Sequence, residues 1–209
     1  MRNQFVRMAA ACAMAMGVLA GVASAQAPAA QTSTTTGPAV ANPTYTSIPM
    51  EIMVNKPAAE VWKRIGKFCD IGEWFQIGAG CKIISGKDGE YGAVRSVANE
   101  ILVAKTELSY TYSQPVRNDR PYDVYHGTLE ARPVSATTSK IVYTLFFDNS
   151  MLADVAARQA DKERRRARFM QALENMKILA EGGTLPPPPP PARRGGAGAP
   201  ATGGAAPGR

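Results

Sequence analysis

The sequence predicts an α+β fold for a single domain, and three observations support this prediction. Several short segments alternate apolar and polar residues with a period of two, most clearly at residues 106–114, where Leu108, Tyr110 and Tyr112 alternate with polar side chains. Such alternation is typical of strands in a sheet with one covered face. Residues 151–181 instead have the length and apolar spacing of a long helix. Strands in the middle of the chain and a long helix at its end give the order of an α+β domain with an antiparallel sheet.

The remaining elements are expected at definite places along the chain. Pro57 opens a helix that runs to about Lys67, because proline is favoured in the first turn of a helix. A second helical turn is expected at residues 71–75, and the glycine-rich residues 86–92 predict a tight turn. The expected strands are residues 45–54, 81–85, 93–98, 106–114, 122–132 and 140–147. Asn149 or Ser150 is expected to cap the long helix, and residues 182–183, both glycine, to end it.

The two ends of the chain differ in composition from its middle. Residues 26–43 are rich in Ala, Thr, Gln and Pro and have no apolar period, which predicts a flexible leader. Residues 184–209 contain six consecutive prolines followed by Ala, Gly, Pro and Arg, which predicts a disordered tail that begins as a polyproline II rod. Residues 44–183 lie between these ends and are numerous enough to bury one core.

The first 25 residues have the pattern of a secretory signal peptide. Arg2 and Arg7 flank a polar start, residues 8–21 are almost wholly apolar, and small residues follow at 23–25. The apolar stretch is too short to span a bilayer as a permanent anchor. We expect cleavage before Gln26 and a periplasmic or secreted mature protein.

Cleavage at that position would remove Cys12 and leave Cys69 and Cys81. An even pair of cysteines in an exported chain predicts a disulfide, which would stabilise the fold by about 3 kcal/mol through the short loop that it closes. The alternative is a pair of reduced, buried cysteines.

Charge and composition exclude several classes of function. Of the 24 basic residues, five lie in the predicted signal and tail, which leaves 19 against 17 acidic residues and no basic stripe for nucleic acid. His126 is the only histidine, so with a disulfide-bonded cysteine pair no metal site is expected. Neither a G-x-S-x-G motif nor a phosphate-binding glycine loop is present, and no cofactor is expected.

Three short motifs, together with the order of the elements, resemble one known superfamily. They are residues 55–62 (NKPAAEVW), residues 68–74 (FCDIGEW) and residues 92–95 (GAVR). The chain is similar over residues 45–181 to the START-related helix-grip superfamily (SRPBCC), in particular to its polyketide cyclase/dehydrase and lipid transport branch. Two features depart from that branch: Trp74 is followed by Phe-Gln where His-Pro is frequent, and residues 97–108 lack an obvious hairpin turn.

The resemblance implies a curved antiparallel sheet wrapped around the long C-terminal helix, with two short helices after the first strand and a cavity between sheet and helix. It also implies a small hydrophobic ligand or lipid as partner. Because some members are enzymes, a polyketide cyclase/dehydratase-like activity in the same cavity is the alternative, and an envelope interaction protein with a vestigial pocket is a second alternative.

One face of the long helix carries polar residues where apolar ones are expected. Helical spacing places Gln159, Lys162 and Arg166 in line with the apolar positions that follow. Arg166, with Lys162 as second choice, is therefore the candidate to bind an acidic head group. In the alternative interpretation this half of the helix overhangs the sheet and its charges form solvated pairs, Asp154 with Arg158 and Asp161 with Arg165.

Aromatic residues on the predicted strands and helices are the candidate walls of the cavity. These candidates are Trp74, Tyr110, Tyr112, Tyr125, Tyr143, Phe147 and Phe169. Trp74 and Phe75, near the expected rim, are also candidates for mobile gate residues, and each aromatic residue has plain core packing as its alternative.

No catalytic residue is assigned, and the sequence favours binding over catalysis without deciding between them. His126 is expected to be structural, because the sequence marks no acid or nucleophile beside it. An enzyme of this fold would need Glu107, His126 or Tyr125 to point into the cavity together.

Overall fold

The structure, a computed structural model, describes residues 40–188. The predicted signal peptide, almost all of the predicted leader and the tail beyond residue 188 lie outside the described residues. Within the described part of the chain, no helix has both the length and the apolar character needed to cross a membrane.

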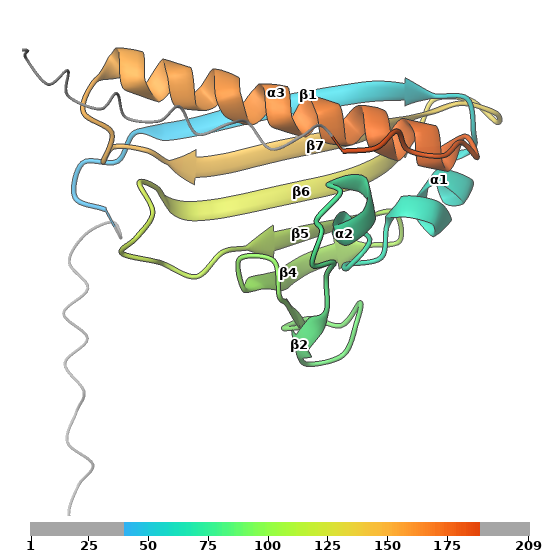
Figure 1. Cartoon of the computed structure of the whole chain (residues 1–209), viewed down its shortest axis with the longest axis horizontal. Coiled ribbons are helices and arrows are strands. Elements are labelled where there is room, and N and C mark those ends of the chain that lie inside the picture. Colours follow the sequence, from blue (N-terminus) through green and yellow to red (C-terminus); the bar gives the residue numbers. More distant parts are fainter. Residues whose placement is uncertain (1–39, 189–209) are drawn as a thin grey trace, which may run out of the picture. The chain divides into compact units, whose positions relative to one another are not determined.

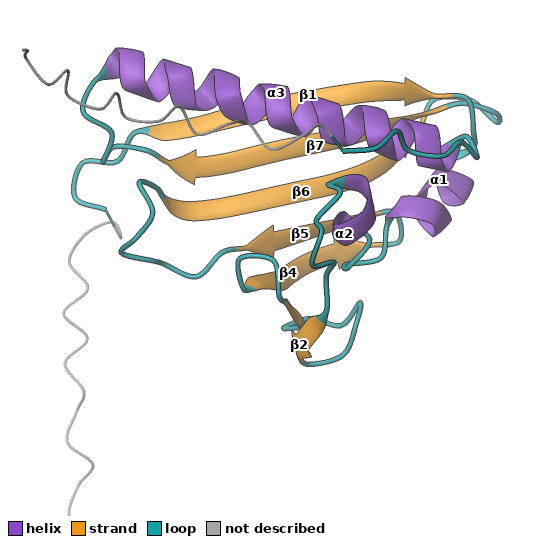
Figure 2. Cartoon of the chain, in the orientation of Figure 1, coloured by secondary structure: helices purple, strands orange, loops and turns teal. Residues whose placement is uncertain are grey.

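A curved, seven-stranded antiparallel sheet forms the body of the domain, with its strands in the order β1-β7-β6-β5-β4-β3-β2 (Figure 1). The strands are β1 (Tyr45–Val54), β2 (Ile83–Ser85), β3 (Val94–Arg95), β4 (Glu100–Thr106), β5 (Ser109–Ser113), β6 (Asp123–Pro133) and β7 (Ser139–Asp148). Helix α3 (Val155–Ala180) runs along one face of this sheet (Figure 2). The predicted α+β helix-grip fold is therefore confirmed.

The long strands form because their apolar residues alternate with polar ones. In β7, Ile141, Tyr143, Leu145 and Phe147 are buried and point toward α3, while most residues between them are partly exposed. β6 repeats the alternation and pairs with β7 over most of its length. The alternation in the sequence thus fixes which face of the sheet is covered.

The middle of the sheet differs from the prediction. Residues 106–114 were expected to be one strand, but Thr106 pairs with Ser109, so β4 and β5 form a hairpin there. The turn before β4 contains Ala98 and Asn99 with positive φ angles of 51° and 54°. Glycine usually marks turns with positive φ angles, and this turn contains none. The start of β4 therefore could not be recognised in the sequence. Of the strand expected at residues 93–98, only β3 (Val94–Arg95) is observed.

The segment after β1 forms the two short helices, α1 (Ala58–Ile65) and α2 (Ile71–Trp74). The predicted disulfide between Cys69 and Cys81 is present, with the two Cα atoms 5.3 Å apart. It closes the loop that contains α2 and so ties this helix to the segment leading into β2.

Helix α3 begins later than expected and has a different cap. Asp154 Oδ1 accepts a hydrogen bond from Ala157 N at 2.8 Å, so the cap is neither Asn149 nor Ser150. Those two side chains are engaged elsewhere, because Ser150 Oγ donates to Asp148 and Asn149 is buried at the end of β7. The helix ends before Gly182, as expected.

Gly127 in β6 allows a close approach of the Tyr112 ring from the neighbouring strand β5. A Cβ atom at this position would lie 2.5 Å from Cε1 of Tyr112 and closer still to its hydroxyl end. The Tyr112 ring therefore lies flat across Gly127, and its hydroxyl forms a 2.9 Å hydrogen bond with that of Tyr143. This contact positions Tyr112 at the edge of the cavity described next.

Candidate functional site

A cavity of about 520 Å³ lies between the inner face of β4, β5 and β6, the middle of α3 and the segment around α2. Sites for small molecules commonly have volumes of about 300–1,000 Å³. The volume therefore suits a small organic ligand.

Aromatic side chains line the cavity on both sides. Tyr112, Tyr122 and Tyr125 come from the sheet side, where the Tyr122 and Tyr125 ring centroids are 5.1 Å apart. Phe75 and Phe169 come from the helix side and meet edge to face at 5.0 Å. These rings create an apolar lining in which neighbouring rings are tilted or edge to face, and the tyrosine hydroxyls add polar points to it.

Helix α3 brings an acid and several arginines to the mouth of the cavity. Asp161, Arg165 and Arg168 share one face because they are four and three residues apart. Asp161 has an exposed side-chain fraction of only 4% and accepts hydrogen bonds from Arg164 and from Arg165 Nε, the latter at 2.7 Å. The guanidinium of Arg165 also lies 4.5 Å from the ring centroid of Tyr122. The predicted pair of Asp161 and Arg165 exists, but Asp161 is buried and not solvated.

Arg168 differs from Arg164 and Arg165 in having no ion pair among the described residues. Its guanidinium lies 4.9 Å from the ring centroid of Phe75, and both side chains line the cavity. Arg120 adds a further positive charge at the mouth and lies 3.9 Å from Asp119. The mouth is therefore positively charged, with Arg168 the guanidinium that lacks an acidic partner there.

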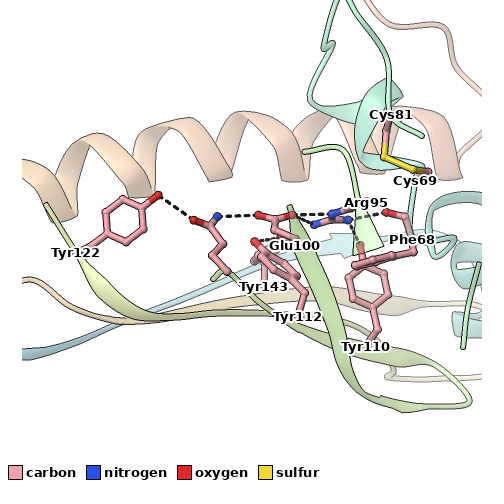
Figure 3. A network of polar contacts seen from close by, with 10 residues as sticks. Phe68, Cys69, Cys81, Arg95, Glu100, Tyr110, Tyr112, Tyr122 and Tyr143 are labelled. Carbon is pink, nitrogen blue, oxygen red and sulfur yellow. Dashed lines mark hydrogen bonds and ion pairs between the residues drawn. A yellow bond between two sulfur atoms is a disulfide. The ribbon is translucent and has the colours of Figure 1, made fainter. Parts of the chain in front are cut away.

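A buried polar network forms the floor of the cavity (Figure 3). Arg95 is fully buried and donates from Nε to Glu100 Oε2 at 2.6 Å and from Nη1 to the carbonyl oxygen of Phe68 at 2.6 Å. Glu100 Oε1 accepts from Gln114 Nε2 at 2.8 Å, and the Tyr122 hydroxyl donates to Gln114 Oε1 at 2.9 Å. Arg95 and Glu100 face each other because they are paired across β3 and β4.

Burial sets the protonation states in this network. Burial raises the pKa of Glu100, while the charge of Arg95 and the hydrogen bond from Gln114 act against that rise. Burial also raises the pKa values of Tyr112 and Tyr143 well above the ordinary value, so both hydroxyls stay protonated at neutral pH. The floor therefore offers the neutral hydroxyl of Tyr112, which is bonded to that of Tyr143 behind it, and the Glu100 carboxyl, which already has two partners.

The structure brings some of the sequence-predicted site residues together and separates others. Phe75, Tyr112, Tyr125 and Phe169 line the cavity of about 520 Å³. Tyr110 lines a different cavity, on the far side of Arg95. Trp74, Tyr143 and Phe147 are fully buried in the core and line neither cavity, while Lys162 and Arg166 also line neither.

The position of Arg166 follows from the rotation of α3. Arg166 Nη1 donates to the carbonyl oxygen of Pro49 in β1 at 3.1 Å. Arg165 precedes it by one residue, or about 100° around the helix, and faces the cavity instead. On the face chosen from the sequence, Phe169 lines the cavity, whereas in the basic half of that face the lining residues are Arg165 and Arg168 and not Lys162 and Arg166. A run of basic residues obscures the helical period there.

Several residues at the site were not found from the sequence. They are Arg95, Glu100, Gln114, Tyr122, Asp161, Arg165 and Arg168 as members of one constellation. Arg95 could have been singled out, because it lies in the residue 92–95 motif of the resemblance. Glu100 belongs to the unrecognised strand β4, so no sequence signal connected it to Arg95.

The residues considered for acid–base catalysis do not meet. Tyr125 is buried on the inner face of β6, whereas its neighbour His126 points to the outer face, where Nδ1 lies 2.9 Å from the carbonyl oxygen of Val124. Glu107 is exposed in the turn between β4 and β5. In the part of the chain that the structure describes, no three His, Cys, Asp or Glu side chains gather in a way that could hold a metal ion.

Solved structures confirm the architecture. A Thermobifida fusca protein solved by NMR is 19% identical with a TM-score of 0.51, over 66% of this chain and 97% of its own. The Bacillus cereus protein XoxI is 22% identical with a TM-score of 0.50, over 64% of this chain and 92% of its own. The Zhui aromatase/cyclase from a Streptomyces species is 16% identical with a TM-score of 0.50, over 68% of this chain and all of its own. At these identities the similarity shows the shared fold.

A comparison with curated proteins gives no match. The sequence profile of the family described as polyketide cyclase/dehydrase and lipid transport, in contrast, matches residues 45–181. This match covers every helix and strand that the structure describes. The chain therefore belongs to the polyketide cyclase/dehydrase and lipid transport family.

Proposed function

We propose that the protein binds a small hydrophobic ligand or lipid with a flat apolar body and an anionic group, in the cavity between the sheet and α3, and that it does so outside the cytoplasm. The observation that carries this proposal is the combination of aromatic walls with arginines at the mouth of a cavity of about 520 Å³. The match to a family described by lipid transport agrees with a hydrophobic ligand.

The anionic group is argued from the charges at the mouth. Arg168 lies over Phe75 with no ion pair among the described residues, so its donors are available to a ligand. A guanidinium matches the planar geometry of a carboxylate, and the apolar body of the ligand would lie against the aromatic walls. Asp161 already binds Arg164 and Arg165, so it offers little repulsion to a second anion.

The hydrogen-bond partners and protonation states of the residues at the cavity floor favour binding without turnover. Glu100 is engaged by Arg95 and Gln114, and the pKa values of Tyr112 and Tyr143 are raised by burial, so none of these groups is a ready base. A polyketide cyclase/dehydratase-like activity in the same cavity remains the second candidate, because the Glu100 carboxyl lines the cavity and burial raises its pKa. An interaction protein with a vestigial pocket is disfavoured by the open volume.

The second part of the proposal is that the protein is exported from the cytoplasm. Residues 1–25 form a cleaved signal, 26–43 a leader, 44–183 the ligand-binding domain and 184–209 a tail. The disulfide between Cys69 and Cys81 supports an oxidising compartment. Mass spectrometry of the protein recovered from a periplasmic fraction tests this part, and a mature chain that still begins at Met1 would contradict it.

The binding proposal is tested with two probes of the same shape, 2-naphthoate and the neutral 2-naphthamide. Titrations of isotope-labelled protein are followed by NMR at the amides of Val97 and Ala98, which line the cavity. Arg168→Gln is expected to weaken 2-naphthoate about tenfold and to leave 2-naphthamide unchanged, because a charge-assisted hydrogen bond contributes about 1.5–3 kcal/mol.

Arg166→Gln is the matched control, since it removes the same charge from the same helix outside the cavity. It is expected to leave the affinities for both probes unchanged. The anionic anchor at Arg168 is refuted if Arg168→Gln weakens both probes equally or neither, and a larger effect of Arg166→Gln would return the role to Arg166. Failure of both probes to shift Val97 and Ala98 would contradict the cavity itself as the binding site.

A further inference from the structure

A second cavity, of about 470 Å³, lies between helix α1 and the hairpin of β4 and β5. One wall consists of Trp62 and Lys63 in α1 and of Gly66, Lys67 and Phe68 just after it. The facing residues come from the loop before β3 and from β4, β5 and the turn between them. The two cavities share no lining residue.

Arg95 lies between Phe68, which lines this cavity, and Tyr112, which lines the first one. Figure 3 shows its polar contacts with Phe68 and Glu100. Its fully buried guanidinium lies 4.3 Å from the ring centroid of Phe68, which lines the second cavity, and 4.6 Å from that of Tyr112, which lines the first. It also holds Glu100 on one side and the carbonyl oxygen of Phe68 on the other. Because removing this side chain would leave Glu100 as an unpaired buried charge, the partition is costly to open.

The second cavity has aromatic walls of its own. The Trp62 and Tyr110 ring centroids are 5.7 Å apart, and Phe68 meets Tyr110 edge to face at 5.5 Å. Gly66 lets the indole of Trp62 lie flat on the chain, since a Cβ atom there would come within 2.6 Å of Cε2 of Trp62. Phe68 and Tyr110 are buried, whereas Trp62 is partly exposed, so a flat apolar body can lie against Trp62 with the other two rings behind it.

The charges on the two walls differ. The wall at α1 carries Lys63 and Lys67 and no acid, and neither lysine forms an ion pair with another described residue. The facing wall carries Asp88, Glu107 and Lys105, whose Nζ donates to the carbonyl oxygen of Gly89. Positive charge thus exceeds negative charge in this cavity, and it is concentrated beside Trp62.

We propose that the second cavity is a binding site in its own right for a flat aromatic or apolar anion, held by Lys63 and Lys67 against Trp62. Arg95 keeps this site separate from the first, so the protein binds two small ligands and not one elongated ligand. The proposal does not depend on the first cavity binding its own ligand, because the two sites use different residues.

The test is the same NMR titration with 2-naphthoate, read at the amides of Gly66 and Gly89 for the second cavity and of Val97 and Ala98 for the first. In the unaltered protein, we expect both pairs of amides to shift, each with its own saturation curve. The double substitution Lys63→Gln/Lys67→Gln is expected to raise the Kd measured at Gly66 and Gly89 at least about tenfold. The curve measured at Val97 and Ala98 is expected to stay unchanged.

Both lysines are exposed, so the double variant should fold normally, which the dispersion of the NMR spectrum checks. The control Lys82→Gln/Lys87→Gln removes two exposed lysines that line neither cavity and is expected to have no effect on either Kd. Arg168→Gln provides the converse variant, which should change only the first curve. A second site is ruled out if Gly66 and Gly89 do not shift, if one curve describes all four amides, or if the lysine variant leaves its Kd unchanged.

Discussion

Gly127→Ala tests whether the close contact between β6 and Tyr112 holds the core and the cavity wall in place. The added Cβ atom would lie 2.5 Å from Cε1 of Tyr112, where ordinary contacts begin at 3.4 Å. The ring must therefore move away from β6. This movement would break the 2.9 Å hydrogen bond between the hydroxyls of Tyr112 and Tyr143, both of which are buried.

The expected loss of stability has two parts. Forcing an extra carbon into a packed core costs about 1–3 kcal/mol. Losing one hydrogen bond between buried groups costs about 1 kcal/mol more. Gly127→Ala should therefore lower the free energy of unfolding by about 2–4 kcal/mol, which urea denaturation followed by circular dichroism measures as a lower midpoint with an unchanged slope.

Gly78→Ala is the matched control, because no atom lies within 4 Å of a Cβ built there and its φ angle is not positive. We expect it to change stability by less than about 1 kcal/mol in either direction, because alanine also restricts the unfolded chain. Tyr112→Leu in the Gly127→Ala background should recover part of the loss by making room. An unchanged midpoint for Gly127→Ala would refute the packing argument.

Two further predictions concern stability. Replacing both Cys69 and Cys81 with alanine should lower the free energy of unfolding by about 2–4 kcal/mol, and the reductant dithiothreitol should lower the midpoint only in the unaltered protein. The pKa of Glu181 is lowered by the backbone N–H of Asn55 and by Lys177. Its contribution to stability is therefore full above the ordinary carboxyl pKa of about 4.3 and is lost as the pH falls through the lower folded value. An NMR titration that finds the Glu181 pKa at or above its ordinary value, or a Glu181→Gln variant with the acid sensitivity of the unaltered chain, would contradict this interpretation.

The positions of the strands could be predicted from the sequence wherever a strand has one covered face. The strands β1, β6 and β7 lie within a residue or two of their predicted positions, because buried and more exposed residues alternate over most of the length of each. Strand β4 was missed for the opposite reason. Four of its residues, including Val103 and Lys105, are exposed, and the turn before it has no glycine to mark it.

The site was harder to predict than the fold, because it depends on residues from separate elements. Tyr112, Tyr125, Phe75 and Phe169 were identified as aromatic residues on strands or helices, but so were Tyr143 and Phe147, which the structure buries away from the cavity. No feature of the sequence distinguishes these groups. The difference arises from where α3 crosses the sheet.

The sequence by itself indicated the order of the elements apart from β4, the covered face of the long strands and, with Cys12 set aside in the predicted signal, the pairing of Cys69 with Cys81, because short periods and two remaining cysteines leave few alternatives. Only the tertiary structure decided the rotation of α3, which turns Arg165 and Arg168 toward the cavity and Arg166 toward β1. Neighbouring residues on a helix point about 100° apart, so in a run of basic residues the face that is covered is set by what packs against it. In this protein that partner is the curved sheet, whose aromatic residues hold Arg165 while the buried Asp161 pairs with it.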